Sequence, residues 1–359
     1  MHPSSIRSAA AMAALTLSLA TVGRQAMAAP PPIRHVFVIV LENKSFDTSF
    51  GPGSPAPYLS QTLTQQGQLL RQYYAIGHAS LDNYIAMVSG QGPNIATQAD
   101  CSFYTGFRPA VATSDGQYLG QGCVYPAPVK TIADQLTAAG LTWKAYMQDM
   151  TSPCRRPAIN TFDTTQRARV GDQYAARHNP FVYFRSLLDS GECSANDVDL
   201  SELETDLSSG APNFAFITPN LCEDGHDAPC VDGRPGGLAQ ADQFLQTWVP
   251  RILGSPAWSE GSLLVITFDE AGSSDASACC GEKPGPNTPN PGGTTLGPGG
   301  GRTGAVLISQ YVQPGSVNDT PYNHYSLLRS IEDAFGLGHL GFAGAADLES
   351  FGPDVYNGP

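Results

Sequence analysis

The chain has 359 residues, of which 32 are acidic and 19 are basic, so its formal net charge is −13. This balance argues against nucleic acid as a partner, because a protein that neutralises a phosphate backbone needs clustered Lys and Arg. It does not exclude a small phosphate-containing substrate, since one bound metal ion can reverse the local charge.

The first 28 residues have the pattern of an export signal. Arg7 precedes a short apolar run over residues 9–22, and Ala26-Met27-Ala28 matches a cleavage site. We therefore expect cleavage near Ala28, with residues 29–359 forming a single domain that is secreted or periplasmic. No later run approaches the ~20 apolar residues of a membrane helix, so stable membrane insertion is not expected.

All eight cysteines lie after the predicted cleavage point. An even number of cysteines in an exported chain suggests disulfide bonds. The order along the chain suggests the pairs Cys101–Cys123, Cys154–Cys193, Cys222–Cys230 and Cys279–Cys280, although spacing alone leaves other pairings open. A zinc site is less favoured, because no CxxC pair faces a second one at the spacing of a zinc finger.

The pattern of apolar residues predicts alternating strands and helices. In chain order we expect a strand at 35–41, a helix at 57–68, a strand at 69–75, a helix at 81–88, a helix at 129–139, a strand at 141–147, an amphipathic segment at 181–188, a strand at 213–218, a helix at 238–253, a strand at 262–268, a strand at 304–309 and a helix at 326–335. Residues 271–302, rich in Gly, Pro, Asn and Ser, are predicted to form a long surface loop. This alternation favours a three-layer α/β/α sandwich around a mostly parallel central sheet.

Polar side chains follow four of the predicted strands. These groups are Glu42 and Asn43, then His78 and Ser80, then Asn220, Asp224, His226 and Asp227, then Asp269 and Glu270, while His324 follows the last strand. Each group alone is more often a helix cap, a turn residue or a histidine with ordinary partners. Ligands of an open α/β sheet bind just beyond the carboxyl ends of its strands, so four groups at one edge indicate a shared site.

The chemistry of these groups predicts a site that binds an anion and a metal cation. Ser80 is expected at a strand-to-helix turn, on a helix N-terminus where anions bind readily. Carboxylate and amide oxygens suit Ca²⁺, Mg²⁺ or Mn²⁺, and added imidazole admits Zn²⁺. The chain has neither a Walker-type phosphate loop nor a G-x-S-x-G elbow, which argues against nucleoside-triphosphate chemistry and against an α/β-hydrolase esterase.

Four motifs carry a resemblance to a known family. The stretches Glu42-Asn43-Lys44-Ser45-Phe46-Asp47, Gly77-His78-Ala79-Ser80-Leu81-Asp82-Asn83-Tyr84, Phe216-Ile-Thr-Pro-Asn220 with Asp224-Gly-His-Asp227, and Ile266-Thr-Phe-Asp-Glu270 resemble the phosphoesterase family. That family contains bacterial acid phosphatases and phospholipases C, within the alkaline-phosphatase-like superfamily. The motifs and their strand context run from residue 35 to about residue 336, so the resemblance covers nearly the whole chain after the leader.

The resemblance implies a role for each matching residue. Glu42, Asn43, Ser80, Asp269 and Glu270 would ligate a divalent metal ion, and Ser80 would also be the nucleophile that becomes phosphorylated. His226 and His324 would hold the phosphoryl oxygens or protonate the leaving group. Asn220, Asp224, Asp227 and His78 would contact a second metal ion or the phosphate, although Asn220 stands where two-metal relatives have Asp.

The resulting expectation is an exported, metal-dependent hydrolase of small phosphate monoesters that works through a phosphoserine intermediate. The first alternative is a phospholipase C that cleaves phosphodiesters of lipids. Ala271-Gly272 after the Asp269-Glu270 pair departs from phospholipase-like members and favours a phosphatase. An alternative of another class is a catalytically silent metal-binding domain, which the presence of Ser80, Asp269 and His324 disfavours. The sequence leaves the physiological substrate, the metal and the oligomeric state open.

Overall fold

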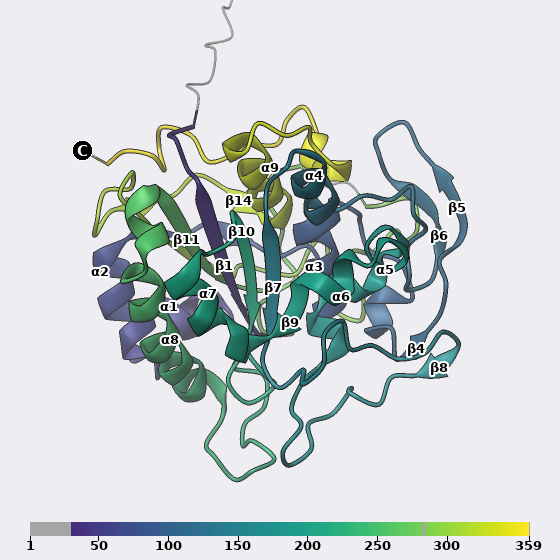
Figure 1. Cartoon of the computed structure of the whole chain (residues 1–359), viewed down its shortest axis with the longest axis horizontal. Helices are drawn as coiled ribbons and strands as arrows, with labels where there is room; N and C mark the ends of the chain where they lie inside the picture. Colours follow the sequence, from purple (N-terminus) through teal and green to yellow (C-terminus); the bar gives the residue numbers. More distant parts are fainter. Residues whose placement is uncertain (1–29, 282–283, 359) are drawn as a thin grey trace, which may run out of the picture.

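The structure is a computed structural model that describes residues 30–281 and 284–358. The predicted export signal lies outside these residues and stays a prediction. The centre of the molecule is an eight-stranded sheet in the order β13-β2-β12-β11-β1-β10-β7-β9 (Figure 1). Its strands are β1 (His35–Leu41), β2 (Gln68–Leu70), β7 (Trp143–Met147), β9 (Asp197–Asp199), β10 (Phe214–Thr218), β11 (Ser262–Phe268), β12 (Ala305–Ser309) and β13 (Val317–Asn318).

The sheet is mostly parallel, as the sequence predicts. β11, β1, β10, β7 and β9 run side by side in one direction, while β12 is antiparallel to both of its neighbours, β11 and β2. Three further pairs of short strands lie outside this sheet. They are β3 (Tyr73–Tyr74) with β14 (Tyr322–Asn323), β4 (Phe103–Tyr104) with β8 (Thr161–Phe162), and β5 (Arg108–Ala112) with β6 (Tyr118–Gln121).

The single strand predicted at 69–75 was wrong, because the chain turns at residues 71–72 and divides it into β2 and β3. β2 belongs to the central sheet, whereas β3 pairs with β14. At the turn, Arg71 donates two hydrogen bonds to the carboxylate of Asp319, next to β13. The apolar run was long enough for one strand, but pairing partners on two separate elements decide where it breaks.

Side chains on successive residues of β1 enter two different cores, which is why this strand is apolar throughout. Val36, Val38 and Val40 pack in the core beneath α3 (Ser80–Ser89), α4 (Ile132–Ala138) and α9 (His324–Ala334). Phe37, Ile39 and Leu41 pack in the core beneath α7 (Leu203–Ser209) and α8 (Gly237–Leu253). Helices therefore cover both faces of the sheet, and the predicted three-layer α/β/α sandwich is confirmed (Figure 1).

Most predicted helices are confirmed with shifted ends. α4 begins at Ile132 because Thr131 and Asp134 form a capping box, and α8 extends through Pro250. The segment at 57–68 is η1 (Tyr58–Leu63) and α2 (Thr64–Gln66), and 181–188 is η4 (Pro180–Tyr183) and α5 (Arg185–Ser190). The remaining short helices are α1 (Phe46–Phe50), α6 (Glu192–Asn196), η2 (Thr97–Ala99), η3 (Ala176–His178), η5 (Leu200–Glu202), η6 (Pro256–Glu260) and η7 (Gly341–Gly344).

All four suggested disulfide pairs are present: Cys101–Cys123, Cys154–Cys193, Cys222–Cys230 and Cys279–Cys280. Between β11 and β12 the described part of the chain forms turns without helix or strand, as predicted. Across residues 30–281 and 284–358, every helix is too short or too polar to cross a membrane.

Candidate active site

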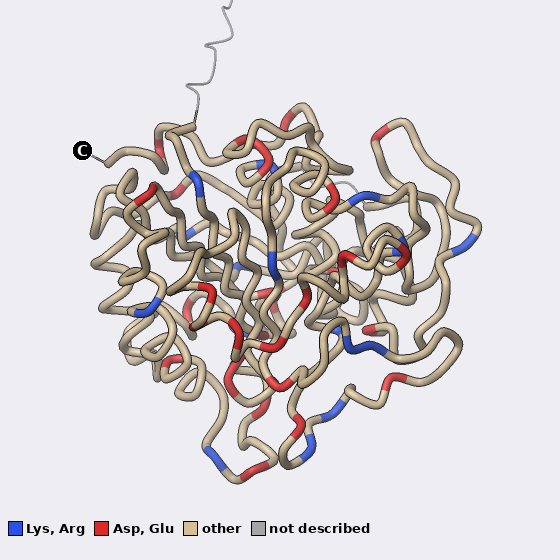
Figure 2. The backbone as a smooth tube through the Cα atoms, in the orientation of Figure 1, with Lys and Arg blue, Asp and Glu red and all other residues tan. Residues whose placement is uncertain are grey.

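Two acidic residues meet where β1 and β11 end side by side. Leu41 pairs with Phe268 in the parallel register, so Glu42 and Asp269 follow at the same level. The amide of Asn43 donates to Oδ1 of Asp269 at 2.9 Å. Both carboxylates are fully buried, and Figure 2 shows acidic segments gathered at this edge of the sheet. The strand order thus brings together residues that are far apart in the sequence.

Ser80 is the first residue of α3, directly after a turn that the side chain of Asn83 holds in place. Asn83 Oδ1 accepts hydrogen bonds from the amides of Ile76 and Gly77, and its Nδ2 donates to the carbonyls of Gly77 and Ala79. The Ser80 hydroxyl lies at the electropositive N-terminus of a ten-residue helix. This turn fixes the backbone that carries the predicted nucleophile.

The carboxylate of Glu42 is the centre of the site. Its Oε2 accepts hydrogen bonds from Ser80 Oγ at 3.0 Å and from Asn43 Nδ2 at 2.8 Å, and its Oε1 accepts one from the Tyr84 hydroxyl at 2.8 Å. Burial, helped by the nearby charges of Asp269 and Asp224, raises the pKa of Glu42 well above its usual value. Burial also raises the pKa of Asp269, although hydrogen bonds from Asn43 and from the Glu42 and Ser80 side chains oppose the rise.

His178, which sequence reasoning missed, lies between two of these carboxylates. Its Nε2 is 3.3 Å from Glu42 Oε1 and its Nδ1 is 3.2 Å from Asp224 Oδ2, and its ring stacks on that of Tyr84. Burial lowers the pKa of His178 well below its usual value and raises that of Asp224 to about 7. The only sequence signal was the His-Asn-Pro stretch ahead of η4, in a segment without periodicity.

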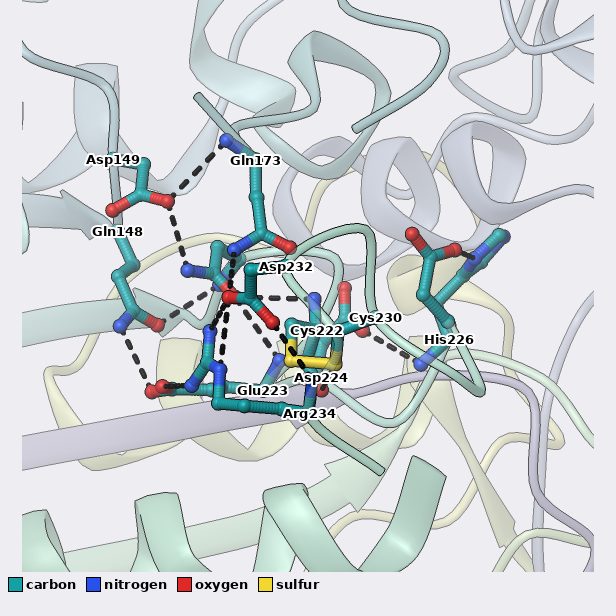
Figure 3. The surroundings of a disulfide bond; sticks show 12 residues. Gln148, Asp149, Gln173, Cys222, Glu223, Asp224, His226, Cys230, Asp232 and Arg234 are labelled. Carbon is teal, nitrogen blue, oxygen red and sulfur yellow. Dashed lines mark hydrogen bonds and ion pairs between the residues drawn. A yellow bond between two sulfur atoms is a disulfide. The ribbon is translucent and has the colours of Figure 1, made fainter. Parts of the chain in front are cut away.

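Asp224 and His226 lie on a loop that the Cys222–Cys230 disulfide closes (Figure 3). The amide of His226 donates to Asp224 Oδ1 at 2.7 Å, and the ring Nδ1 lies 2.7 Å from Asp227 Oδ1. The His226 side chain is 35% exposed, in contrast to the buried Asp224. The loop is tied to the end of β1 by Lys44 Nζ, which donates to the carbonyl of Gly225 at 2.7 Å.

His324, the first residue of α9, uses both ring nitrogens for contacts inside the protein. Nε2 lies 2.6 Å from the carbonyl oxygen of Asp269, and Nδ1 lies 3.1 Å from the Tyr73 hydroxyl. Burial lowers the pKa of His324 to about 4. This arrangement holds the backbone of Asp269 in place, whereas the implied contact with phosphoryl oxygens stays a prediction.

Three other predicted residues lie around this centre. Nδ2 of Asn220 donates to Asp149 Oδ2 at 2.9 Å, and its Oδ1 accepts from two backbone amides of its own loop, so its contacts are those of a loop-capping residue. His78 Nε2 lies 2.7 Å from the carbonyl of Asp275, and its Nδ1 lies 3.9 Å from Glu270 Oε1. Burial, then the Asp269 charge, raises the pKa of Glu270 well above its usual value.

The donor set of the site fits a divalent cation. Among the described residues, the buried oxygens Asp269 Oδ2 and Glu270 Oε2 have no hydrogen-bond partner. Ligand atoms of Glu42, His178 and Asp224 lie within 4.8 Å of one another. Burying several carboxylates together is costly unless a positive charge compensates them, and oxygen-rich sites of this kind suit hard cations.

The fold and the site together define a three-layer α/β protein with a buried acidic centre around a serine at a helix N-terminus. The sequence pattern of the Phosphoesterase family matches residues 53–338. The chain therefore belongs to the Phosphoesterase family, and the resemblance drawn from the motifs is confirmed.

Curated relatives include phosphatases from fungi and bacteria. The chain is 26% identical over 307 residues to a phosphate-repressible acid phosphatase of Penicillium chrysogenum, covering 84% of this chain and 59% of that protein. It is 26% identical over 322 residues to a phosphatidylinositol-3-phosphatase of Mycobacterium tuberculosis, covering 89% of this chain and 82% of that protein. Across the fungal acid phosphatases it matches, the chain spans only 51% to 59% of their length.

A solved structure shows the same fold. The structure of Ps i-CgsB is 12% identical, with a TM-score of 0.50 over 89% of this chain and 75% of that chain. At this identity the likeness concerns the fold alone.

Proposed function

We propose that this chain is a metal-dependent phosphomonoesterase that uses Ser80 as its nucleophile. The observation that carries the proposal is the hydrogen bond of Ser80 Oγ to the buried carboxylate of Glu42, at the N-terminus of α3. Membership of the Phosphoesterase family supports phosphoester chemistry, and the acid phosphatases among its relatives favour monoesters as substrates.

The residues that would hold the metal ion are Glu42, Asn43, Ser80, Asp269 and Glu270, with His178 and Asp224 adjoining them. Asn43 donates through Nδ2 to Glu42, which leaves its amide oxygen as the ligand atom. When bound, a divalent cation would lower the pKa of a hydroxyl group beside it and neutralise charge that develops on the phosphoryl oxygens.

Each side chain of the site has a distinct role in the reaction. The hydrogen bond to Glu42 fixes the Ser80 rotamer, and the N-terminus of α3 favours the negative charge of the phosphoryl group. Ser80 Oγ passes its proton to Oε2 of Glu42, the acceptor of its hydrogen bond, and forms a bond to phosphorus as the bond from phosphorus to the leaving oxygen breaks. His226, which is partly exposed on the disulfide loop, gives the leaving oxygen a proton. Water then attacks the phosphorus and gives a proton to His226, while Ser80 Oγ leaves the phosphorus and takes its proton back from Glu42, so that inorganic phosphate is released and the side chains are restored.

His324 is assigned a positioning role in this scheme. Because its two ring nitrogens face the Asp269 carbonyl and the Tyr73 hydroxyl, it orients the strand end that carries Asp269. A ring held in this way keeps the Asp269 carboxylate aimed at Ser80 and Glu42 without itself touching substrate.

The test is a comparison of p-nitrophenyl phosphate with p-nitrophenylphosphorylcholine. The chain is purified, stripped with EDTA, and assayed before and after addition of Ca²⁺, Mg²⁺, Mn²⁺ or Zn²⁺. We expect metal-restored hydrolysis of the monoester and little of the diester. Preferential diester cleavage would support the phospholipase C alternative. A chain that binds metal but hydrolyses neither ester would support the silent metal-binding alternative.

We also infer that the chain works in an oxidising compartment. Four disulfides among the described residues support this, because disulfides persist in the periplasm and outside cells and are rare in the cytosol. Comparing the chain in periplasmic and cytosolic fractions of a producing bacterium, with N-terminal sequencing of the mature form, tests both export and the predicted cut near Ala28.

A further inference from the structure

We propose that a pocket lined by Arg177 and His226 holds the alcohol part of the phosphoester and selects substrates whose alcohol carries a second anionic group. This inference rests on the proposed function and specifies its substrate class. The pocket has a volume of about 610 Å³ and lies between the loop at 166–168 and the disulfide loop that carries His226, with Arg177 also in its wall. In Figure 2 the loop that leads away from β8 carries basic segments.

Arg177 connects this pocket to the candidate active site. Its side chain is buried, and its Nη2 lies 3.4 Å from His226 Nε2. Its Nε lies 3.9 Å from Asp100 Oδ2, and Asp100 Oδ1 accepts a hydrogen bond from the amide of Leu81, the residue after Ser80. The Arg177 charge also lowers the pKa of Glu42, of Asp224 and of Glu270 against the larger effect of burial. The inner wall of the pocket is therefore next to the reacting centre.

Arg167 supplies a second positive charge at the exposed rim. Within residues 30–281 and 284–358, no carboxylate forms an ion pair with Arg167, whereas Arg155 and Arg234 are both paired. The acidic residue of the wall, Asp227, directs its Oδ1 to the ring of His226. Arg177 lies beside Asp100 and Asp227 faces His226, so Arg167 is the charged side chain of this wall that has no ion-pair partner among the described residues. It lies in a chain whose net charge is −13. A local positive field of this kind attracts and orients anions.

The remaining wall is apolar and held in place. Leu221 is buried and Val231 is exposed, and they flank the two cysteines of the Cys222–Cys230 disulfide. Lys44 ties the same loop to the end of β1. A short carbon chain would lie against this wall while its carboxylate or second phosphate reaches Arg167. The favoured substrates are small phosphorylated hydroxy acids and bisphosphates, in preference to esters of neutral alcohols.

The test compares two substrates that differ in one group, 3-phosphoglycerate and glycerol 3-phosphate. The first carries a carboxylate where the second carries a hydroxymethyl group. We expect kcat/KM to be about 5-fold higher for 3-phosphoglycerate, the size expected of one solvent-exposed charge pair, and to approach equality at high salt. In the Arg167→Gln variant the preference should fall to about 1, because kcat/KM for 3-phosphoglycerate falls more than kcat/KM for glycerol 3-phosphate.

Arg169→Gln is the matched control, because Arg169 is exposed on the same loop and is not part of the pocket wall. It should keep the wild-type preference. Equal kcat/KM for the two substrates in the wild type, or an unchanged preference in Arg167→Gln, would overturn the pocket proposal while leaving the proposed function standing. If the metal-loaded wild type hydrolyses neither ester nor p-nitrophenyl phosphate, the proposed function fails and the pocket proposal falls with it.

Discussion

The hydroxyl of Ser80 donates a hydrogen bond of 3.0 Å to Oε2 of Glu42, although the two residues are 38 positions apart in the chain. Glu42 directly follows the central strand β1, and Ser80 begins the helix α3 that packs on one face of the sheet. A serine hydroxyl aimed at a buried carboxylate, beside Asp269, has the partners that a metal-assisted nucleophile needs. The predictions below test what this contact and its neighbours do.

Replacing Ser80 by Ala should abolish turnover without unfolding the protein. The substitution removes one hydrogen bond, whereas the loss of a nucleophile costs at least ~10³-fold in kcat. Ser89→Ala is the control, because Ser89 lies in the last turn of the same helix and donates only to the carbonyl of Ile85. Hydrolysis of p-nitrophenyl phosphate and circular dichroism check both variants. Activity retained in Ser80→Ala would remove Ser80 as the nucleophile.

Replacing His178 by Phe should weaken metal binding by about 10- to 100-fold, in the range seen when a group that supports a metal site is lost. The aromatic ring preserves the stacking on Tyr84 but removes both nitrogens that face Glu42 and Asp224. Titration calorimetry with Mn²⁺ on the EDTA-stripped protein measures the effect. His339→Phe, a change at a surface turn where His339 pairs with Asp333, should leave the affinity unchanged. Equal affinities in the two variants would exclude His178 from the metal site.

Substitutions of His226 and His324 should differ in how strongly their effect on the rate depends on the leaving group of the substrate. If His226 protonates the leaving oxygen, His226→Gln should slow glycerol 3-phosphate far more than p-nitrophenyl phosphate, whose leaving group needs little protonation. His324→Gln should lower kcat by about 10-fold for both substrates with little change in KM, because it disturbs the position of Asp269.

Tyr73→Phe provides a milder version of the His324 test. It removes only the hydroxyl beside His324 Nδ1, and we expect a drop in kcat of about 3-fold that is again equal for both substrates. A leaving-group-dependent loss in His324→Gln would instead assign the proton transfer to His324.

Asp197 should make the folded state less stable as the pH rises. Burial raises the pKa of Asp197 to about 8, so between about pH 4 and pH 8 the folded state keeps a proton that the unfolded state releases. The free energy of unfolding should therefore fall by up to about 1.4 kcal/mol per pH unit across this window. The contribution is fully present below pH 4 and lost above pH 8.

Asp197→Asn isolates this effect, because an amide has the shape of the protonated acid and does not titrate. The hydrogen bond from Asn179 Nδ2 has an oxygen acceptor in either residue. Urea unfolding at pH 5 and pH 8 should show a smaller pH dependence in the variant than in the wild type. The same pH dependence in both proteins would mean that Asp197 is already ionised in the folded state.

Much of the fold could be predicted because the relevant signals are local. The apolar run of β1 indicated a strand buried on both faces, and the 3.6-residue spacing from Leu238 to Leu253 indicated α8. The order of the cysteines suggested the pairs that the structure contains. The division of 69–75 into β2 and β3 could not be read from the run itself, because it depends on which distant strands offer hydrogen bonds.

The polar groups that follow each predicted strand can be located in the sequence, and the ends of parallel strands necessarily lie at one edge of the sheet. Glu42, Ser80, Asp224 and Asp269 are therefore predictable from the sequence as residues of one site. Three features depend on the folded arrangement instead: His178 and Arg177 lie beside these residues, Asn220 caps its own loop, and His324 faces the backbone of Asp269. These side chains belong to irregular or short helical segments or, for His324, to the first residue of a helix. Their directions follow from packing against distant residues, which no periodic pattern records.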